Sequence, residues 1–301
     1  MIKQFSDYTE VPKAKLTDYL LIHDGNGVKK ISKENFMSEA EIALAIICGT
    51  YDGVDLTVKF ADEIANYPDE WAWIQARLDS GDLSGLHIHD YIPINAMGER
   101  HEAQIAGINT YKGCCDTQVK THIDWITRDC LSQTVQWNTS NINNGNATNA
   151  NPFLVSNLHS WLVGTVYPTL DAKLKNVIKD KRMHVPNRYT SGATLTDDNS
   201  GHWDSLDKLW VPFEGEIFDD TVWSTKGHGN WHAVQYPIFA NSYKARIKGA
   251  GPGGDRTHWW EASAYSGNST GACHVNDTGR ANGNYASYAH RVPVCFRTMA
   301  A

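Results

Sequence analysis

The sequence predicts an α+β protein that combines a small antiparallel sheet with helices and long irregular loops. Apolar runs of strand length are short and scattered along the chain. Segments with apolar residues at helical spacing occur between residues 60 and 181. Long polar stretches cover residues 138–152, 187–203 and 219–231, and loops of this length usually carry function.

Composition divides the chain near residue 58. All eleven tryptophans lie from Trp71 onward, and the first 58 residues contain none. A turn signal at Tyr51-Asp52-Gly53 separates two apolar segments near this point. A length of 301 residues is comfortable for two domains. We therefore expect a small N-terminal anchor or oligomerisation module over residues 1–58 and a binding domain over residues 59–301.

The N-terminal module is expected to contain a β-hairpin and one helix. Strand-like residues 19–22 and 28–31 flank a Gly- and Asn-rich loop at residues 23–27. Ser38 and Glu41 form a capping box for a helix that ends at Gly49. This helix is apolar on every side, so the second domain or other copies of the chain must cover it. The residues expected to make anchor and oligomer contacts are Leu20, Ile22, Ile42, Leu44, Ile46 and Ile47.

In the larger domain, the order of helices and strands follows from periodicity and from end signals. Helices are expected near residues 60–65, from Asp69 to Gly81, near residues 122–130, and over residues 153–181 with a break at Pro168. Short strands are expected at residues 91–94, 104–108, 245–247, 271–275 and 291–296.

Charge and hydropathy exclude several classes of protein. A net charge of -7 and a pI near 6.0 lack the basic footprint of a nucleic-acid binder. The longest apolar run, residues 42–48, is too short to cross a bilayer, and the first residues show no secretory signal. We therefore expect synthesis in the cytoplasm and no membrane insertion. The six cysteines are interpreted as buried, reduced thiols.

Signatures of the common enzyme sites are missing, so we predict neither enzymatic activity nor a cofactor. The sequence has no Gly-x-Ser-x-Gly elbow, no His-Glu-x-x-His motif, no P-loop and no dinucleotide fingerprint. Asp204, Glu214, Glu216 and Asp219 suggest glycosidase carboxylates as an alternative. A solvated acidic turn around Pro212 is the favoured interpretation.

His87 and His89 raise the question of a metal site. They would share one face of a strand, and His101, Glu102 and Asp129 are possible partners. Nothing in the sequence ties these residues together, and alternating His and Ile in a partly buried strand explains the pattern. No metal site is predicted.

The C-terminal residues 255–290 have the composition of a binding surface. Tyr, Ser, Asn and Gly dominate this stretch, with Trp and His among them. Tyr and Trp supply rigid contact area, whereas Ser, Gly and Asn supply adaptable hydrogen bonds. A turn-rich loop would also favour Asn and Gly, but it explains the tyrosines less well.

Several segments together resemble a phage-associated domain with a C-type-lectin-like fold of the formylglycine-generating-enzyme type. They read LWVPFEGEIF at residues 209–218, QYPIF at 235–239, WW at 259–260 and RVPVCF at 291–296. Residues 105–111, 122–124 and 152–158 fit the same pattern, so the resemblance covers roughly residues 60–296. Glu261 and Ala262 follow the double tryptophan where Leu-Arg is usual. Cys273 and Cys295 lie 22 positions apart (295 − 273), unlike the close catalytic pair of the enzyme branch.

The resemblance implies a virion structural protein, fibre- or tail-associated, that binds a glycan or protein on the bacterial surface. Related proteins commonly form trimers, and the N-terminal hairpin resembles modules that attach phage fibres to other virion proteins. One alternative is an architectural head-fibre or capsid-decorating protein, and another is an enzyme of the formylglycine-generating type or a carbohydrate hydrolase. The residues implied for receptor binding are Trp260, Glu261, Tyr265, Asn282, Asn284, Tyr285, Ser287, Tyr288 and His290.

Overall fold

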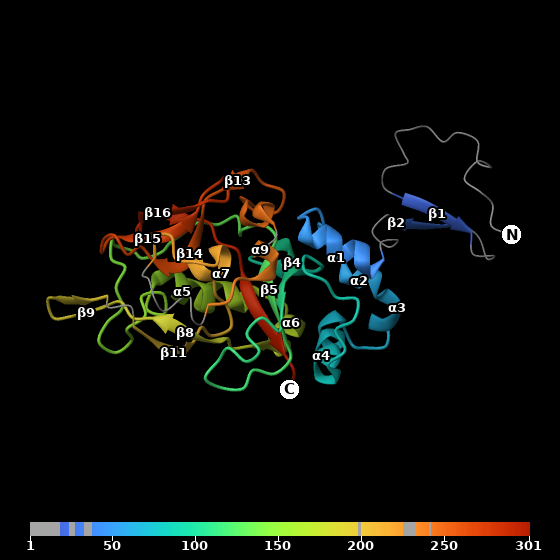
Figure 1. Cartoon of the computed structure of the whole chain (residues 1–301), viewed down its shortest axis with the longest axis horizontal. Coiled ribbons are helices and arrows are strands. Elements are labelled where there is room, and N and C mark those ends of the chain that lie inside the picture. The colour runs from blue at the N-terminus through green and yellow to red at the C-terminus, as the bar shows by residue number, and fades with distance from the viewer. Residues whose placement is uncertain (1–18, 24–27, 33–37, 198–199, 225–232, 241) are drawn as a thin grey trace. The chain divides into compact units, whose positions relative to one another are not determined.

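The structure, a computed structural model, describes residues 19–23, 28–32, 38–197, 200–224, 233–240 and 242–301 (Figure 1). The chain divides into two compact units, Met1–Ala45 and Ile46–Ala301, so the larger unit begins before residue 58. Strands and short helices are interspersed along the chain, which confirms the predicted α+β class. Within the described residues, no helix combines the length and the apolar character that crossing a bilayer requires.

The N-terminal hairpin and helix form as the sequence predicts. Strands β1 (Tyr19–His23) and β2 (Val28–Ser32) pair antiparallel, and the predicted turn at residues 24–27 lies outside the described residues. Helix α1 spans Glu39–Ile47. The Glu41 carboxylate accepts hydrogen bonds from the Ser38 amide at 2.7 Å and the Ser38 hydroxyl at 2.9 Å. The Glu41 amide donates to the Ser38 hydroxyl at 3.3 Å, which completes the capping box.

Helix α1 keeps apolar side chains in contact with solvent in the single chain. Ile42 is buried and Ile46 is half-buried. Leu44 is 60% exposed and Ile47 is 66% exposed.

The helices of the larger unit are short, and α4 is the longest of those described. The Asp69 carboxylate caps α4 by accepting the amides of Trp71 at 2.9 Å and Ala72 at 2.8 Å, and Gly81 ends it with φ 74°. The predicted break at Pro168 is confirmed by a π-helical and a 3-10 segment between two α-helices. The described helical segments are α2 (Leu56–Lys59), α3 (Ala61–Ile64), α4 (Glu70–Ser80), α5 (Asn157–Trp161), η4 (Leu162–Val166), η5 (Tyr167–Thr169), α6 (Ala172–Val177), α7 (Glu214–Phe218), α9 (Pro237–Ala240) and η6 (Tyr243–Arg246).

Two antiparallel sheets organise the larger unit. One has five strands in the order β3-β4-β5-β18-β7, and the other has three in the order β14-β15-β16. Figure 1 shows β14, β15 and β16 side by side in red at one end of this unit. The strands are β3 (Tyr91–Ala96), β4 (Glu99–Ile108), β5 (His122–Thr127), β6 (Val135–Gln136), β7 (Ile178–Lys179), β8 (Arg182–Pro186), β9 (Tyr189–Ser191), β10 (Thr194–Thr196), β11 (Gly201–Ser205), β12 (Lys248–Gly249), β13 (Arg256–Thr257), β14 (Trp259–Ala264), β15 (Gly271–Val275), β16 (Ala281–Tyr285), β17 (Ala289–His290) and β18 (Cys295–Met299).

Three local predictions are corrected. The helix predicted near residues 122–130 is strand β5, in which every residue is buried, so the alternation that marks a half-exposed strand is absent. The strand predicted at residues 245–247 is largely the 3-10 helix η6. The strand predicted at residues 291–296 begins only at Cys295, because Val292 to Val294 form a buried connection.

Aromatic side chains join helix α4 to the five-stranded sheet. The Trp71 ring meets Trp125 of β5 edge-on at 5.3 Å and Phe296 of β18 at 5.8 Å, measured between ring centroids. Trp125 and Phe296 stack at 6.1 Å with an interplanar angle of 13°. These contacts bury large apolar areas and place α4 against β18.

Charged side chains are paired inside the same core. Asp124 of β5 and Arg297 of β18 form a bidentate pair with both N···O distances at 2.7 Å, and both side chains are 1% exposed. The Arg297 guanidinium lies 5.4 Å from the centroid of the Tyr111 ring, and the Lys181 ammonium lies 4.3 Å from it. The ring is thus part of a buried cluster of charges.

Lys181 and Glu216 form a second buried ion pair beside Tyr111. The Glu216 carboxylate accepts hydrogen bonds from the Lys181 ammonium, from the Tyr111 hydroxyl, and from the Phe213 amide at 2.9 Å. Lys181 also donates to the Tyr236 hydroxyl at 2.9 Å. The pair therefore connects the end of the five-stranded sheet to α7, the helix that leads to the C-terminal sheet.

Replacing Arg297 by Met is expected to lower the free energy of unfolding by about 3–5 kcal/mol, because Asp124 would remain in the interior without its partner. Urea denaturation followed by tryptophan fluorescence measures the loss. Arg182→Met is the matched control: Arg182 also pairs twice with Asp116, at 2.8 and 2.6 Å, but this pair is partly exposed. The control should cost less than about 1 kcal/mol. Equal losses would contradict a dominant role for the buried pair.

Candidate functional site

The C-terminal sheet has two faces with different chemistry. Side chains alternate along β16, so Gly283 and Tyr285 share one face while Asn282 and Asn284 point to the other. Strand β15 pairs His274 with Asn282, which places His274 on the asparagine face. The glycine face carries aromatic residues, and the asparagine face carries histidines.

A first aromatic pair lies over the glycine face. The rings of Trp223 and Tyr265 are 5.7 Å apart, and the Trp223 indole donates to the Ala281 carbonyl at 3.2 Å. The Tyr265 ring lies so close to Gly283 that a Cβ at that position would be 3.1 Å from it. Glycine in β16 therefore makes room for the Tyr265 ring.

A second aromatic pair continues the same face. Tyr285 is the next residue after Gly283 on this side of β16, and its ring meets that of Tyr288 edge-on at 5.6 Å. Tyr285 is 49% exposed, Tyr288 is 52% exposed and Trp223 is 40% exposed. We call Trp223, Tyr265, Tyr285 and Tyr288 together the aromatic surface.

Hydrogen bonds fix the turn that carries the two exposed tyrosines. The Tyr288 amide donates to the Tyr285 carbonyl at 2.9 Å. The Ser287 amide and hydroxyl donate to the Asn141 side chain at 3.2 and 2.6 Å, and Gln136 donates to the Ser287 carbonyl at 2.7 Å. Exposed rings on a fixed backbone lose little conformational entropy when they bind a partner.

The other face of the sheet carries a cluster of three histidines. Nδ1 of His258 lies 3.1 Å from Nε2 of His274. The His290 ring lies 4.8 Å from that of His274 and 4.4 Å from that of Trp260, measured between centroids. Nδ2 of Asn284 donates to Nε2 of His290 at 3.1 Å.

Burial keeps two of these imidazoles neutral near pH 7. It lowers the pKa of His274 from 6.5 to about 3, with further lowering by His290 and His258. It lowers the pKa of His290 to about 4, and His258 again contributes. Protonation of either ring would place a charge beside Trp260 in the interior.

The predicted receptor-binding residues separate into surface and interior positions. The prediction that Trp260 and Glu261 lie on a binding surface is wrong. Strand β14 is buried along its whole length, and both side chains are 0% exposed. The Trp260 indole donates to the Val135 carbonyl at 2.9 Å, as a core residue does. Exposed residues of the predicted set are Asn282, Tyr285 and Tyr288, and partly exposed ones are Tyr265, Asn284, Ser287 and His290.

The acidic residues near Pro212 are not a solvated turn. Glu214 and Glu216 are both 0% exposed, which corrects the favoured interpretation. The Glu214 carboxylate accepts the amides of Val222 at 2.9 Å, Trp223 at 3.0 Å and Ser224 at 2.8 Å. It thereby holds the segment that presents Trp223. Sequence reasoning did not single out this tryptophan, although the polar stretch at residues 219–231 contains it; residues 225–232 lie outside the described part.

The histidines considered for a metal site lie in other surroundings. His87 and His89 occupy a turn before β3 rather than a strand, and His89 has φ 79°. Nδ1 of His87 is 3.3 Å from the Asp90 carboxylate. His101, Glu102 and Asp129 are brought together in the lining of a pocket of about 180 Å³. Its Asp129 carboxylate already accepts backbone amides at 2.9 and 3.2 Å.

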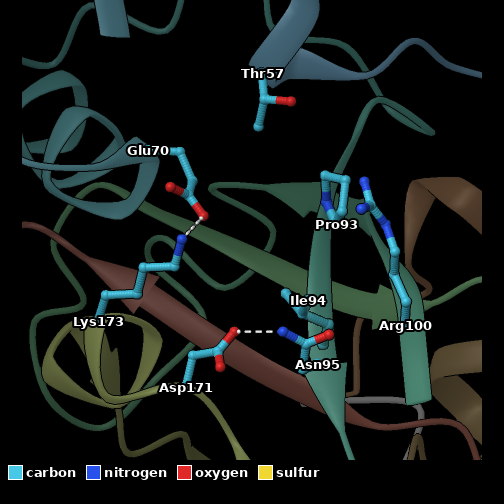
Figure 2. Close-up of a pocket in the computed structure, with 8 residues that line it drawn as sticks. All are labelled: Thr57, Glu70, Pro93, Ile94, Asn95, Arg100, Asp171 and Lys173. Atoms are coloured by element: carbon cyan, nitrogen blue, oxygen red, sulfur yellow. Dashed lines mark hydrogen bonds and ion pairs between the residues drawn. The ribbon is translucent and has the colours of Figure 1, made fainter. Parts of the chain in front are cut away.

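A second pocket, of about 250 Å³, lies between α4, β3 and the start of α6 (Figure 2). Figure 2 shows two interactions across it, an ion pair between Glu70 and Lys173 at 2.6 Å and a hydrogen bond from Asn95 to Asp171 at 3.1 Å. The lining residues are Thr57, Glu70, Pro93, Ile94, Asn95, Arg100, Asp171 and Lys173.

Comparison with known proteins identifies a family for this fold. A family model described as a domain of unknown function, DUF6273, matches residues 126–298, which is more than half of the chain. The chain belongs to the DUF6273 family. The DUF6273 match includes the C-terminal sheet and the whole aromatic surface. Neither the curated proteins nor the solved structures contain a match to this chain.

Acidification is expected to destabilise this DUF6273 domain. An unfolded chain protonates His290 near its ordinary pKa of 6.5, whereas the folded chain does so only near about 4. Between these values the unfolded state binds more protons, so this contribution to stability is complete above pH 6.5 and falls as the pH drops. His290→Gln should make the decline of the thermal unfolding midpoint between pH 6.5 and 4 shallower.

The control for this experiment is His202→Gln in β11, where the ring is 35% exposed. This variant leaves the histidine cluster intact and serves as the reference for the effect of removing a surface imidazole. Parallel curves for wild-type protein and His290→Gln would contradict the assignment.

Proposed function

We propose that this chain is a fibre- or tail-associated phage virion protein that binds the bacterial surface through the aromatic surface of a C-type-lectin-like domain. The observation that carries the proposal is the exposed Tyr285–Tyr288 pair, held on a hydrogen-bonded turn beside Trp223 and Tyr265. Large exposed aromatic side chains that cluster on a rigid support are typical of binding surfaces.

The chemistry of this surface suits a bacterial glycan or an extended protein loop. Aromatic faces stack on the apolar side of a sugar ring or on a partner side chain, and their hydroxyl groups supply hydrogen bonds at the edge. Asn282, also exposed on β16, adds an amide that both donates and accepts. The resemblance to phage receptor-binding domains favours a ligand on the host cell.

Helix α1 and the hairpin before it support the assembly part of the proposal. Helix α1 offers Leu44 and Ile47 as exposed apolar contacts, which suit association with other copies of the chain. Trimers are the expected assembly, and the hairpin β1–β2 would attach them to other virion proteins. Several copies on one particle multiply weak individual contacts into strong adhesion.

Replacing Tyr285 and Tyr288 together by Ala is expected to weaken binding of the purified full chain to intact bacteria by at least about tenfold, because both rings would leave the contact. Binding of labelled protein to a panel of bacterial strains measures the change on each strain that the wild-type protein binds. Tyr67→Ala is the matched control, because Tyr67 is 40% exposed but lies between α3 and α4.

Full binding by the double variant would remove the aromatic surface from the proposal. Failure of the wild-type protein to bind any strain would instead favour the architectural alternative, in which the domain contacts other virion proteins.

Replacing Leu44 and Ile47 together by Glu is expected to reduce the mass in solution from an oligomer to a monomer, because charge would replace apolar contacts between copies. Multi-angle light scattering on the full chain measures the mass. Val58→Glu serves as the control, since Val58 is 69% exposed and lies in α2 outside the proposed contact. A wild-type monomer, or an oligomer that persists in the double variant, would overturn this part of the proposal.

A further inference from the structure

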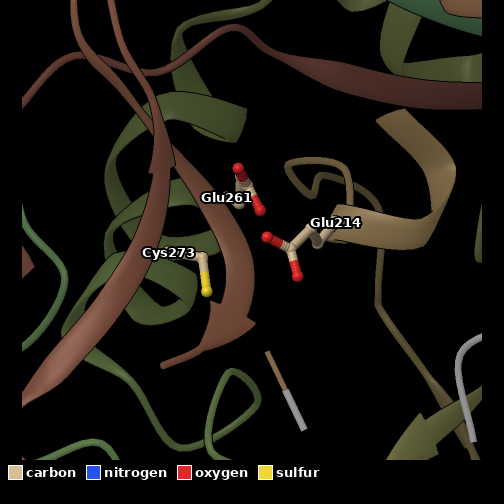
Figure 3. Close-up of side chains that lie close together, drawn as sticks. All are labelled: Glu214, Glu261 and Cys273. Atoms are coloured by element: carbon tan, nitrogen blue, oxygen red, sulfur yellow. The ribbon is translucent and has the colours of Figure 1, made fainter. Parts of the chain in front are cut away.

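Two carboxylates and a thiol converge beneath the glycine face of the C-terminal sheet. Glu214 comes from α7, Glu261 from β14 and Cys273 from β15. One ligand atom of each lies within 4.8 Å of the others, and all three residues are buried. Figure 3 shows the carboxylates of Glu214 and Glu261 facing each other, with Cys273 on the neighbouring strand.

The Glu261 carboxylate has no partner in the described part of the protein. Both of its oxygens are without a hydrogen bond, although the residue is 0% exposed. Glu214 differs, because three backbone amides donate to it. An unpaired carboxyl group in the interior carries a large desolvation cost, so its position beside a second carboxylate and a thiol calls for a ligand.

We propose that Glu214, Glu261 and Cys273 form a buried binding site for a divalent transition-metal ion of the Zn²⁺ type. A thiol favours such an ion over Ca²⁺ or Mg²⁺, which take oxygen ligands almost exclusively. The carboxylate oxygens of Glu261, Sγ of Cys273 and one carboxylate oxygen of Glu214 supply the donors. Among the described residues, the Glu214 carboxylate accepts backbone amides and keeps lone pairs that an ion can use.

Metal binding at this site exchanges protons for the ion. Burial raises the pKa of the Glu261 carboxyl well above its usual range, and Glu214 raises it further. Burial together with the two carboxylates raises the pKa of the Cys273 thiol in the same direction. A divalent cation binds the thiolate and carboxylate forms, so any proton that either group carries is released to solvent when the ion enters.

A shared proton is the competing explanation for the same arrangement. A protonated Glu261 facing Glu214 would form a neutral-acid and carboxylate pair that needs no ion. The two explanations predict different responses to a chelator. Only a metal site loses its bound ion, and the stability that the ion adds, when the chelator removes free ions.

The test uses the full chain refolded under reducing conditions with Co²⁺, because the cluster is closed to solvent. The expected result is about one ion per chain and a sulfur-to-cobalt charge-transfer band in the near ultraviolet. Cys273→Ser should abolish the band. Glu261→Gln, which preserves shape, should weaken binding at least about tenfold. Cys130→Ser, a buried thiol elsewhere in the core, should retain the band.

A thermal measurement decides the matter if Cys273→Ser fails to fold. Zn²⁺ should raise the unfolding midpoint of wild-type protein above that in chelator, and Glu261→Gln should lose most of this difference. Absence of the band in wild-type protein with no difference between Zn²⁺ and chelator would overturn the metal site. Persistence of the band in Cys273→Ser would do so as well.

Discussion

The buried charge cluster around Tyr111 is the constraint on which the larger unit depends. Asp124 and Arg297 join two neighbouring strands of the five-stranded sheet, and Lys181 with Glu216 joins the edge of that sheet to α7. Each charge can remain in the interior only while its partner stays in place. The cluster therefore fixes the position of α7 relative to the sheet, and α7 carries Glu214 toward the C-terminal strands.

Helix α7 in turn supports the aromatic surface through Glu214. The Glu214 side chain points inward and accepts hydrogen bonds from three consecutive backbone amides, those of Val222, Trp223 and Ser224. These amides lie outside the helices and strands, so the carboxylate supplies the partner that regular secondary structure would otherwise give. This arrangement leaves Trp223 outside, next to Tyr265. A binding surface on loops needs such a support, because loose loops pay an entropic cost each time they engage a ligand.

Local sequence signals predicted what depends on local interactions. The capping box at Ser38, the cap at Asp69 and the break at Pro168 were all recognisable because their partners lie within a few residues. Strand β5 was misread as a helix because burial on both faces removes the alternation of a strand. The C-terminal region was proposed as a binding surface from its composition. Composition does not show whether a given side chain points to solvent or to the core. Trp260 and Glu261 therefore seemed exposed when they are interior. The convergence of Glu214, Glu261 and Cys273 joins positions far apart in the chain, and no spacing rule detects it.

The hydrogen bonds that hold residues 285–288 come from backbone groups and from Ser287, not from the tyrosine rings. The frame and its exposed side chains are therefore separable. Positions 285 and 288 can exchange one side chain for another at little cost to the fold, whereas a Cβ at Gly283 would lie 3.1 Å from the Tyr265 ring and would require that ring to shift. A protein whose binding partner changes over time would thus have two positions free to vary beside one glycine that is more constrained.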